Sequence, residues 1–258
     1  MPGYTHLQVA MPSSFGLWFG AYAESLTDDM LFLQAAYKMT NRNPLGSAAG
    51  YGSSFPLNRT MTTDLLGFDS MNYNVVYAQM GRGKTERNVA FAMASVAGTL
   101  SKMAFDACMF NSQNFGFVKL PDECTTGSSI MPHKKNPDVF ELLRAKCNKL
   151  QALPQQIILI MNNLPCGYFR DLQLIKEVFL PAFGELEECL QMAAYIINKM
   201  QVNEHILDDP RYDNMFSVEE VNRLAATGTP FRDAYKQVGL AIEAGNFHPD
   251  KNIRHTHE

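Results

Sequence analysis

Residues 85–111 decide the fold class, and they read TERNVAFAMASVAGTLSKMAFDACMFN. Apolar side chains recur there every three or four residues, which is the spacing of one face of an α-helix. The residues on this face are Val89, Phe91, Ala92, Val96, Leu100, Met103, Ala104 and Ala107. We therefore predict one long amphipathic helix over this stretch, of the kind that packs into a bundle.

Three more stretches show the same periodicity. Residues 15–39 contain no proline, and a helix of that length spans about 38 Å at 1.5 Å per residue. Another helix is predicted over residues 137–160, with a kink at Pro154 because proline lacks the backbone donor. The last runs over residues 171–200 and should bend at Pro181. Four long helices of this kind predict a helical bundle.

The rest of the chain predicts little other regular structure. Residues 41–58 are rich in Gly, Ser, Pro and Asn, which indicates a long loop, and residues 62–66 indicate a weaker helix. Strand-like alternation is confined to short pieces such as residues 115–120. We therefore predict an all-α protein.

A domain boundary is expected where Asp208, Asp209 and Pro210 end the last long helix. Residues 1–207 would form the central helical-bundle domain, and residues 208–258 a small C-terminal helical domain. Two shorter helices are predicted in that second domain, over residues 218–226 and 231–244, and His255 and His257 belong to an exposed tail rather than to a metal site.

Composition restricts the class of protein. The chain is 46% hydrophobic and 19% charged, which predicts a folded, soluble protein. Its net charge of −4 argues against a nucleic-acid or membrane-surface partner. The N-terminus does not resemble a secretion signal, and the five cysteines form no Cys-x-x-Cys pair, so we expect neither a disulfide framework nor a zinc cluster. A cytoplasmic location fits these features.

The loop at residues 125–137 reads TTGSSIMPHKKNP and is the strongest candidate for a site. A serine is a poor base at neutral pH, so its use as one requires cations or backbone donors that stabilise its alkoxide. Lys134 and the amides of the loop could do this for Ser128. The alternative interpretation is a serine-rich turn that caps the following helix.

The whole string around this loop resembles the signature of the fumarase/aspartase superfamily, whose members release fumarate by β-elimination. Residues 2–8, PGYTHLQ, resemble the Thr-His segment of that superfamily. The segment 168–173, YFRDLQ, followed by Lys176, resembles the argininosuccinate lyase branch, as does KKNPD at residues 134–138. The resemblance implies a long-helix bundle and cleavage of argininosuccinate to arginine and fumarate without a cofactor or metal.

The resemblance also implies roles for single residues. Ser128 would be the catalytic base, and Lys134 would stabilise the aci-carboxylate carbanion that forms when the proton leaves. His6 would protonate the departing guanidinium nitrogen, and Glu141 would pair with His6 and favour its imidazolium form; a solvated carboxylate is the alternative for Glu141. The substrate would be bound by Thr5, Ser129, Asn136, Tyr168, Gln173 and Lys176. We expect Gln173 and Lys176 to share one helix face near its N-terminus.

Members of the family form homotetramers in which each active site draws residues from three subunits, so Ser128 and His6 need not meet within one chain. The family also carries an upstream domain with a substrate-binding loop, and no such string occurs in these residues. We therefore expect this chain alone to turn over little substrate. Adenylosuccinate lyase, aspartase or a non-catalytic structural homologue are the alternatives.

The motif at residues 81–85, GRGKT, resembles part of a phosphate-binding loop. That pattern needs a glycine at position 78, where Ala78 stands, and a preceding hydrophobic strand, which is missing from the sequence. We do not expect nucleotide binding there.

Overall fold

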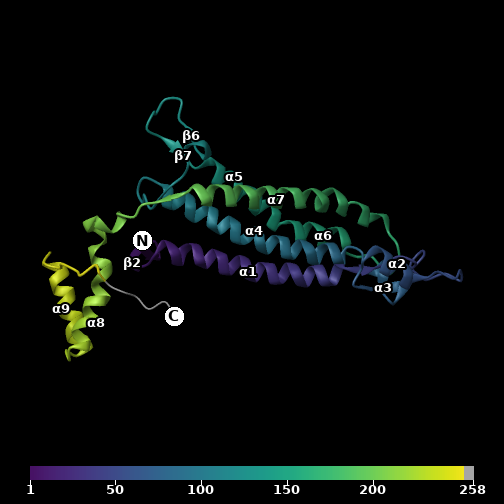
Figure 1. Ribbon diagram of the computed structural model, residues 1–258, viewed down its shortest axis with the longest axis horizontal. Helices are drawn as coiled ribbons and strands as arrows, with labels where there is room; N and C mark the ends of the chain where they lie inside the picture. Colours follow the sequence, from purple (N-terminus) through teal and green to yellow (C-terminus); the bar gives the residue numbers. More distant parts are fainter. Residues whose placement is uncertain (253–258) are drawn as a thin grey trace. The chain divides into compact units, whose positions relative to one another are not determined.

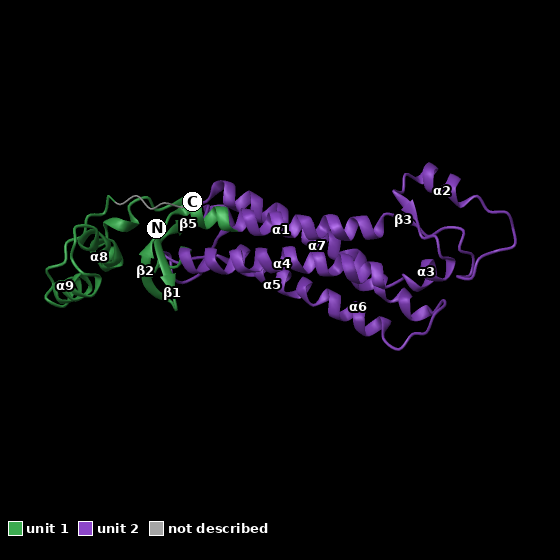
Figure 2. Ribbon diagram, turned by 90° about the horizontal axis from the view of Figure 1, so that it is seen from below, with its two compact units in different colours: residues 1–21, 111–119, 201–258 green, residues 22–110, 120–200 purple. Residues whose placement is uncertain are grey.

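The computed structural model describes residues 1–252. The chain forms two compact units, which Figure 2 colours separately. Among the described residues, unit 1 contains residues 1–21, 111–119 and 201–252, and unit 2 contains residues 22–110 and 120–200. This division differs from the expected boundary after residue 207, because segments far apart in the sequence pack together in unit 1.

Long helices dominate the fold, as the periodicity predicted (Figure 1). They are α1 (Phe15–Thr40), α4 (Lys84–Asn111), α5 (Asp138–Gln151), α6 (Leu153–Met161) and α7 (Ile175–Lys199). The prediction of an all-α, long-helix bundle is confirmed. No helix among residues 1–252 combines the length and the apolar character needed to cross a membrane.

The kink expected at Pro154 is a break between two helices. Helix α5 ends at Gln151, and α6 begins at Leu153 with Pro154 in its first turn. Proline fits there because the first amides of a helix have no partner inside it. Pro181 lies inside α7, which continues through it from Ile175 to Lys199.

Helix α4 forms the inner part of unit 2. Half of its buried residues are alanines, and their small size allows other helices to approach closely. The buried residues of α4 are Ala90, Ala92, Met93, Val96, Ala97, Leu100, Met103, Ala104, Ala107 and Phe110. The alternation of alanine with larger apolar residues therefore makes α4 the core of the bundle.

Polar contacts fix α1 against α4. Asp29 is buried, and its carboxylate accepts hydrogen bonds from Ser95 Oγ at 2.5 Å and from Thr99 Oγ1 at 2.7 Å. Seven residues earlier in α1, about two turns away, Tyr22 donates to Asp106 at 2.5 Å, and burial together with this bond raises the pKa of Tyr22. Buried polar groups must be paired, so these contacts set the register of the two helices.

Shorter elements complete one end of unit 2. They are β3 (Arg42–Asn43), α2 (Arg59–Leu66), β4 (Ser70–Met71) and α3 (Val75–Met80), and β3 pairs with β4 in parallel. The expected weak helix at residues 62–66 is confirmed as part of α2. Helix α3 was not predicted, although Asn74 caps it by accepting from the amides of Val76 and Tyr77.

Unit 1 contains the longest strands that the sequence prediction missed, at residues 2–5 and 8–12. β1 (Pro2–Thr5) pairs antiparallel with β2 (Gln8–Pro12), and β5 (Val118–Lys119), inside the predicted piece 115–120, pairs with β8 (Gln201–Val202). Aromatic contacts between Tyr4, Phe115 and Phe117 hold the hairpin within this unit. The expectation of no strand outside such short pieces is therefore wrong for residues 2–12.

The predicted C-terminal helices are confirmed as α8 (Ser217–Ala226) and α9 (Phe231–Glu243). They follow two 3₁₀ helices, η3 (Ile206–Asp208) and η4 (Pro210–Phe216), and they share a small core of Val221, Ala234 and Val238. The tail residues His255 and His257 lie outside the described residues.

Candidate functional site

A short antiparallel ladder holds the signature loop. β6 (Thr126–Gly127) pairs with β7 (Lys135–Asn136), so residues 128–134 form the turn that joins them. Asn136 lies in β7, and α5 begins two residues later at Asp138, one residue after the predicted start at residue 137. The ladder therefore fixes both ends of the loop that carries Ser128, Ser129 and Lys134.

Ser128 is half-buried, and backbone donors point at its oxygen. Its Oγ accepts from the amide of Met131 at 3.2 Å and from the amide of Ile130 at 3.4 Å. Both bonds are on the long side, but both strengthen if the oxygen becomes negative. The loop thus supplies the backbone donors that a serine base requires.

The two lysines of the loop differ in their partners. Lys135 forms an ion pair with Asp122, which lies in η1 (Asp122–Cys124). The Lys134 side chain is exposed and has no ion-pair partner among residues 1–252, while its amide donates to Met131 O at 3.0 Å. Lys134 is therefore the lysine whose charge is available to an anion.

His6 and Leu7 form the two-residue turn of the β1–β2 hairpin. Their φ angles are +52° and +57°, so both residues adopt the left-handed backbone conformation, as in a type I′ turn. Such turns favour Asn-Gly, and other residues are held there at a cost on the order of 1 kcal/mol each. Thr5 ends β1, and both Thr5 and His6 are exposed in unit 1.

Glu141 lies in the first turn of α5, and its side chain is exposed. It belongs to unit 2, as do Ser128 and Lys134, whereas His6 belongs to unit 1. The pairing of Glu141 with His6 stays a prediction.

The segment 168–176 is organised differently from the expectation. Gln173 ends a 3₁₀ helix, η2 (Arg170–Gln173), and α7 begins only at Ile175. Gln173 and Lys176 therefore do not share one helix, because Leu174 separates the two elements. Gln173 instead donates from Nε2 to the hydroxyl of Tyr168 at 3.1 Å, so the structure brings these two predicted binding residues together.

Residues of the candidate site occupy both ends of unit 2. Figure 1 shows the β6–β7 hairpin at one end of the bundle and the connection between α6 and α7 at the other. Helices α5 and α6 run between them, and their residues 138–161 span about 36 Å at 1.5 Å per residue. Ser128 and Tyr168 of one chain therefore cannot touch the same small substrate.

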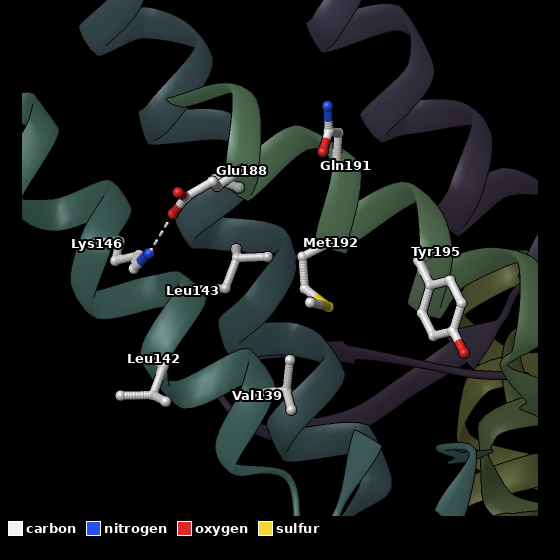
Figure 3. Close-up of a pocket in the computed structure, with 9 residues that line it drawn as sticks. Val139, Leu142, Leu143, Lys146, Glu188, Gln191, Met192 and Tyr195 are labelled. Carbon is white, nitrogen blue, oxygen red and sulfur yellow. Dashed lines mark hydrogen bonds and ion pairs between the residues drawn. The ribbon is translucent and has the colours of Figure 1, made fainter. Parts of the chain in front are cut away.

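An apolar groove of about 600 Å³ runs along α5 and α7 and contains none of the predicted site residues. Figure 3 shows Val139, Leu142, Leu143, Met192 and Tyr195 lining it. Lys146 and Glu188 pair across it at 2.8 Å. Cys147 is a buried residue of α5, and burial raises the pKa of its thiol to about 12, so that cysteine is a core side chain rather than a nucleophile.

Comparisons with known proteins define the class first. The sequence model of a family described as lyase matches residues 1–152, which is more than half of the chain, and the chain belongs to this family. Solved structures agree on the fold. An EDDS lyase in complex with formate has a TM-score of 0.84 and 25% identity, and the match covers 95% of this chain and 50% of that one. A class II fumarase from Schistosoma mansoni has a TM-score of 0.73 and 18% identity, and covers 95% of this chain and 58% of that one, which supports the fold alone.

The curated relatives are more specific. The argininosuccinate lyase of Phocaeicola vulgatus is 84% identical over all 258 residues, and that of Bacteroides thetaiotaomicron is 82% identical over the same length. The argininosuccinate lyase of Stenotrophomonas maltophilia is 39% identical over 244 residues, 95% of this chain and 56% of that protein. The chain spans 58% of the length of the first two relatives. The resemblance to argininosuccinate lyases is therefore confirmed.

Proposed function

We propose that this chain carries catalytic residues of a lyase that cleaves argininosuccinate into arginine and fumarate by reversible β-elimination, a step of arginine biosynthesis in the cytoplasm. The observation that carries the proposal is the 84% identity over all 258 residues, site segments included, to a protein named argininosuccinate lyase. The long-helix fold and the donors around Ser128 Oγ support it.

In the proposed reaction, Ser128 removes the proton from the carbon next to a substrate carboxylate. The electron pair of that C–H bond moves into the carboxylate and forms an aci-carboxylate dianion. Lys134, Ser129 and Asn136 interact more strongly as this charge develops, which is how a preorganised site lowers a barrier. The amides of Ile130 and Met131 hold the serine oxygen in its charged form.

The dianion then collapses to fumarate and breaks the C–N bond. The electron pair of that bond leaves with the guanidinium nitrogen, which takes a proton from His6. Glu141 pairs with His6 and favours its charged form. Thr5, Tyr168, Gln173 and Lys176 bind the substrate.

The working assembly is proposed to be a homotetramer whose active sites are shared between subunits. The separation of Ser128 from Tyr168 within unit 2 supports this, because another copy must bring the second set of residues to the first. Exposed apolar side chains on α1, including Met30, Leu31 and Phe32, and the groove between α5 and α7 supply surface for such association.

A chimera tests the function directly. In this chimera, residues 1–258 replace the matching segment of the Phocaeicola vulgatus relative, and fumarate release is followed by ultraviolet absorbance. We expect turnover of argininosuccinate and none of adenylosuccinate or aspartate, while the 258-residue chain alone should turn over little. A chimera that folds but releases no fumarate from argininosuccinate, or prefers another substrate, would contradict the proposal.

A further inference from the structure

The GRGKT motif forms a fixed turn between α3 and α4. Gly83 has a φ of +79°, and a Cβ there would lie 2.7 Å from Met161 Cγ at the end of α6, so only glycine fits. Its amide donates to Glu86 Oε2 at 2.7 Å. Glu86 is the third residue of α4, and a side chain at that position commonly caps the residue just before the helix, here Gly83. The motif therefore works as a structural turn that places Arg82 against the segment after α6.

Arg82 lies beside Tyr168, a predicted binding residue that is itself hydrogen-bonded to a second one, Gln173. Its guanidinium carbon is 5.7 Å from the centroid of the Tyr168 ring, and the Tyr168 hydroxyl accepts the bond from Gln173. Arg82 is half-buried, and among residues 1–252 no carboxylate forms an ion pair with it. A guanidinium ordinarily binds a carboxylate through two parallel hydrogen bonds, and here that capacity is unused.

A second donor without an acceptor belongs to a residue that lines the same cavity as Arg82. Gln79 and Arg82 both line a cavity of about 140 Å³, with Met161 and Leu172 among its apolar walls. The Nε2 atom of Gln79 is buried and has no hydrogen-bond partner in the described part of the chain. Buried donors are nearly always satisfied, so the cavity is complementary to a group that offers acceptor oxygens.

We infer that Arg82 is a further substrate-binding residue, and that with Gln79 it takes the α-carboxylate of the arginine half of the substrate, beside Tyr168 and Gln173. The identity of the substrate rests on the proposed function. Argininosuccinate has three carboxylates, and the two of its succinate half must lie near Ser128, where the charge develops. The α-carboxylate of the arginine half is therefore the one that remains available to Arg82 and Gln79.

Binding of L-arginine and of agmatine, which is arginine without its carboxylate, tests this inference. Saturation-transfer NMR on the 258-residue chain detects weak binding and needs no catalysis. We expect L-arginine to bind more tightly than agmatine. Arg82→Gln should lower the affinity for L-arginine by about 10- to 100-fold and leave the affinity for agmatine unchanged. Arg82→Lys keeps the charge but loses the planar fork, so its effect should be intermediate.

Lys84→Gln is the matched control, because Lys84 belongs to the same motif but is exposed and lies over the Tyr77 ring at 5.4 Å. It should leave L-arginine affinity unchanged, and circular dichroism should show all variants to be equally helical. The inference would be overturned if Arg82→Gln weakened the binding of L-arginine and agmatine equally, or left L-arginine affinity unchanged. It would also be overturned if the wild-type chain did not bind L-arginine. L-arginine binding that depends on Arg82, in a chimera that releases no fumarate, would instead refute only the proposed function.

Discussion

The β6–β7 loop and the cluster formed by Arg82, Tyr168 and Gln173 lie at opposite ends of unit 2 and organise polar groups in different ways. In the loop, backbone amides point at Ser128 Oγ, and the Lys134 side chain is exposed. In the cluster, side chains position one another, and a glycine turn holds Arg82 in place. The first arrangement suits charge that appears during a reaction, and the second suits charge that the substrate already carries. We therefore expect substitutions in the loop to lower kcat and substitutions in the cluster to raise KM.

Ser128→Ala should have the largest effect. It removes the proposed base, and the chimera should lose about 10²- to 10⁴-fold in kcat because proton transfer loses its acceptor. Circular dichroism should show unchanged helicity, since the hydrogen bonds of the Ser128 side chain stay within its own loop in the described chain. Fumarate release within about tenfold of the wild-type rate would show that Ser128 is not the base.

The two lysines of the loop form a matched pair for the next effect. Lys134→Gln should lower kcat about 10²-fold, the size expected when one donor to a developing anion is lost. Lys135→Gln should change kcat little, because Lys135 is already paired with the exposed Asp122 and exposed pairs contribute little. Equal decreases in kcat for the two variants, measured by steady-state kinetics, would contradict the claim that Lys134 and not Lys135 stabilises the developing anion.

Tyr168→Phe tests the other end of unit 2. The variant keeps the ring under Arg82 but loses the hydroxyl that accepts from Gln173. We expect KM for argininosuccinate to rise about 3- to 10-fold, the value of one hydrogen bond, with kcat nearly unchanged. A fall in kcat at constant KM would place Tyr168 with the chemistry instead of with binding.

Gly83→Ala should affect stability more than chemistry. The left-handed φ and the 2.7 Å approach to Met161 Cγ predict that the free energy of unfolding falls by about 1–3 kcal/mol. Gly98→Ala is the control, because Gly98 lies inside α4 and a Cβ there would make only ordinary contact, at 3.7 Å from Gln151 Oε1. That variant should gain about 0.5–1 kcal/mol from helix propensity. Urea unfolding of the 258-residue chain measures both, and equal effects of the two substitutions would contradict the assignment of the turn.

Periodicity was sufficient to predict the long helices, because each of them buries one continuous stripe of side chains. It could not predict the β1–β2 hairpin, whose turn is His6-Leu7 instead of the Asn-Gly that marks such turns in a sequence. Periodicity also could not predict which segments form unit 1, because that depends on packing between residues 1–21, residues 111–119 and the C-terminal part of the chain. Local patterns carry no information about such long-range contacts.

The candidate site was predictable to the extent that a residue lies in a recognisable string. Ser128, Lys134 and Asn136 belong to such a string, and the structure places them on one loop. Arg82 and Gln79 were missed because the turn that contains Arg82 matches no ligand-binding pattern, and their significance comes from the cavity beside Tyr168. The expectation for Gln173 and Lys176 failed because the helix begins two residues later than Gln173.

Mixing two inactive variants tests most directly the central claim, that the two ends of unit 2 act together through different copies of the chain. One chimera carries Ser128→Ala and the other carries Tyr168→Ala with Gln173→Ala, and the two are coexpressed. If each site draws its two ends from different copies, random assembly restores up to about a quarter of wild-type fumarate release. Activity no higher than that of the two variants measured separately would contradict the claim.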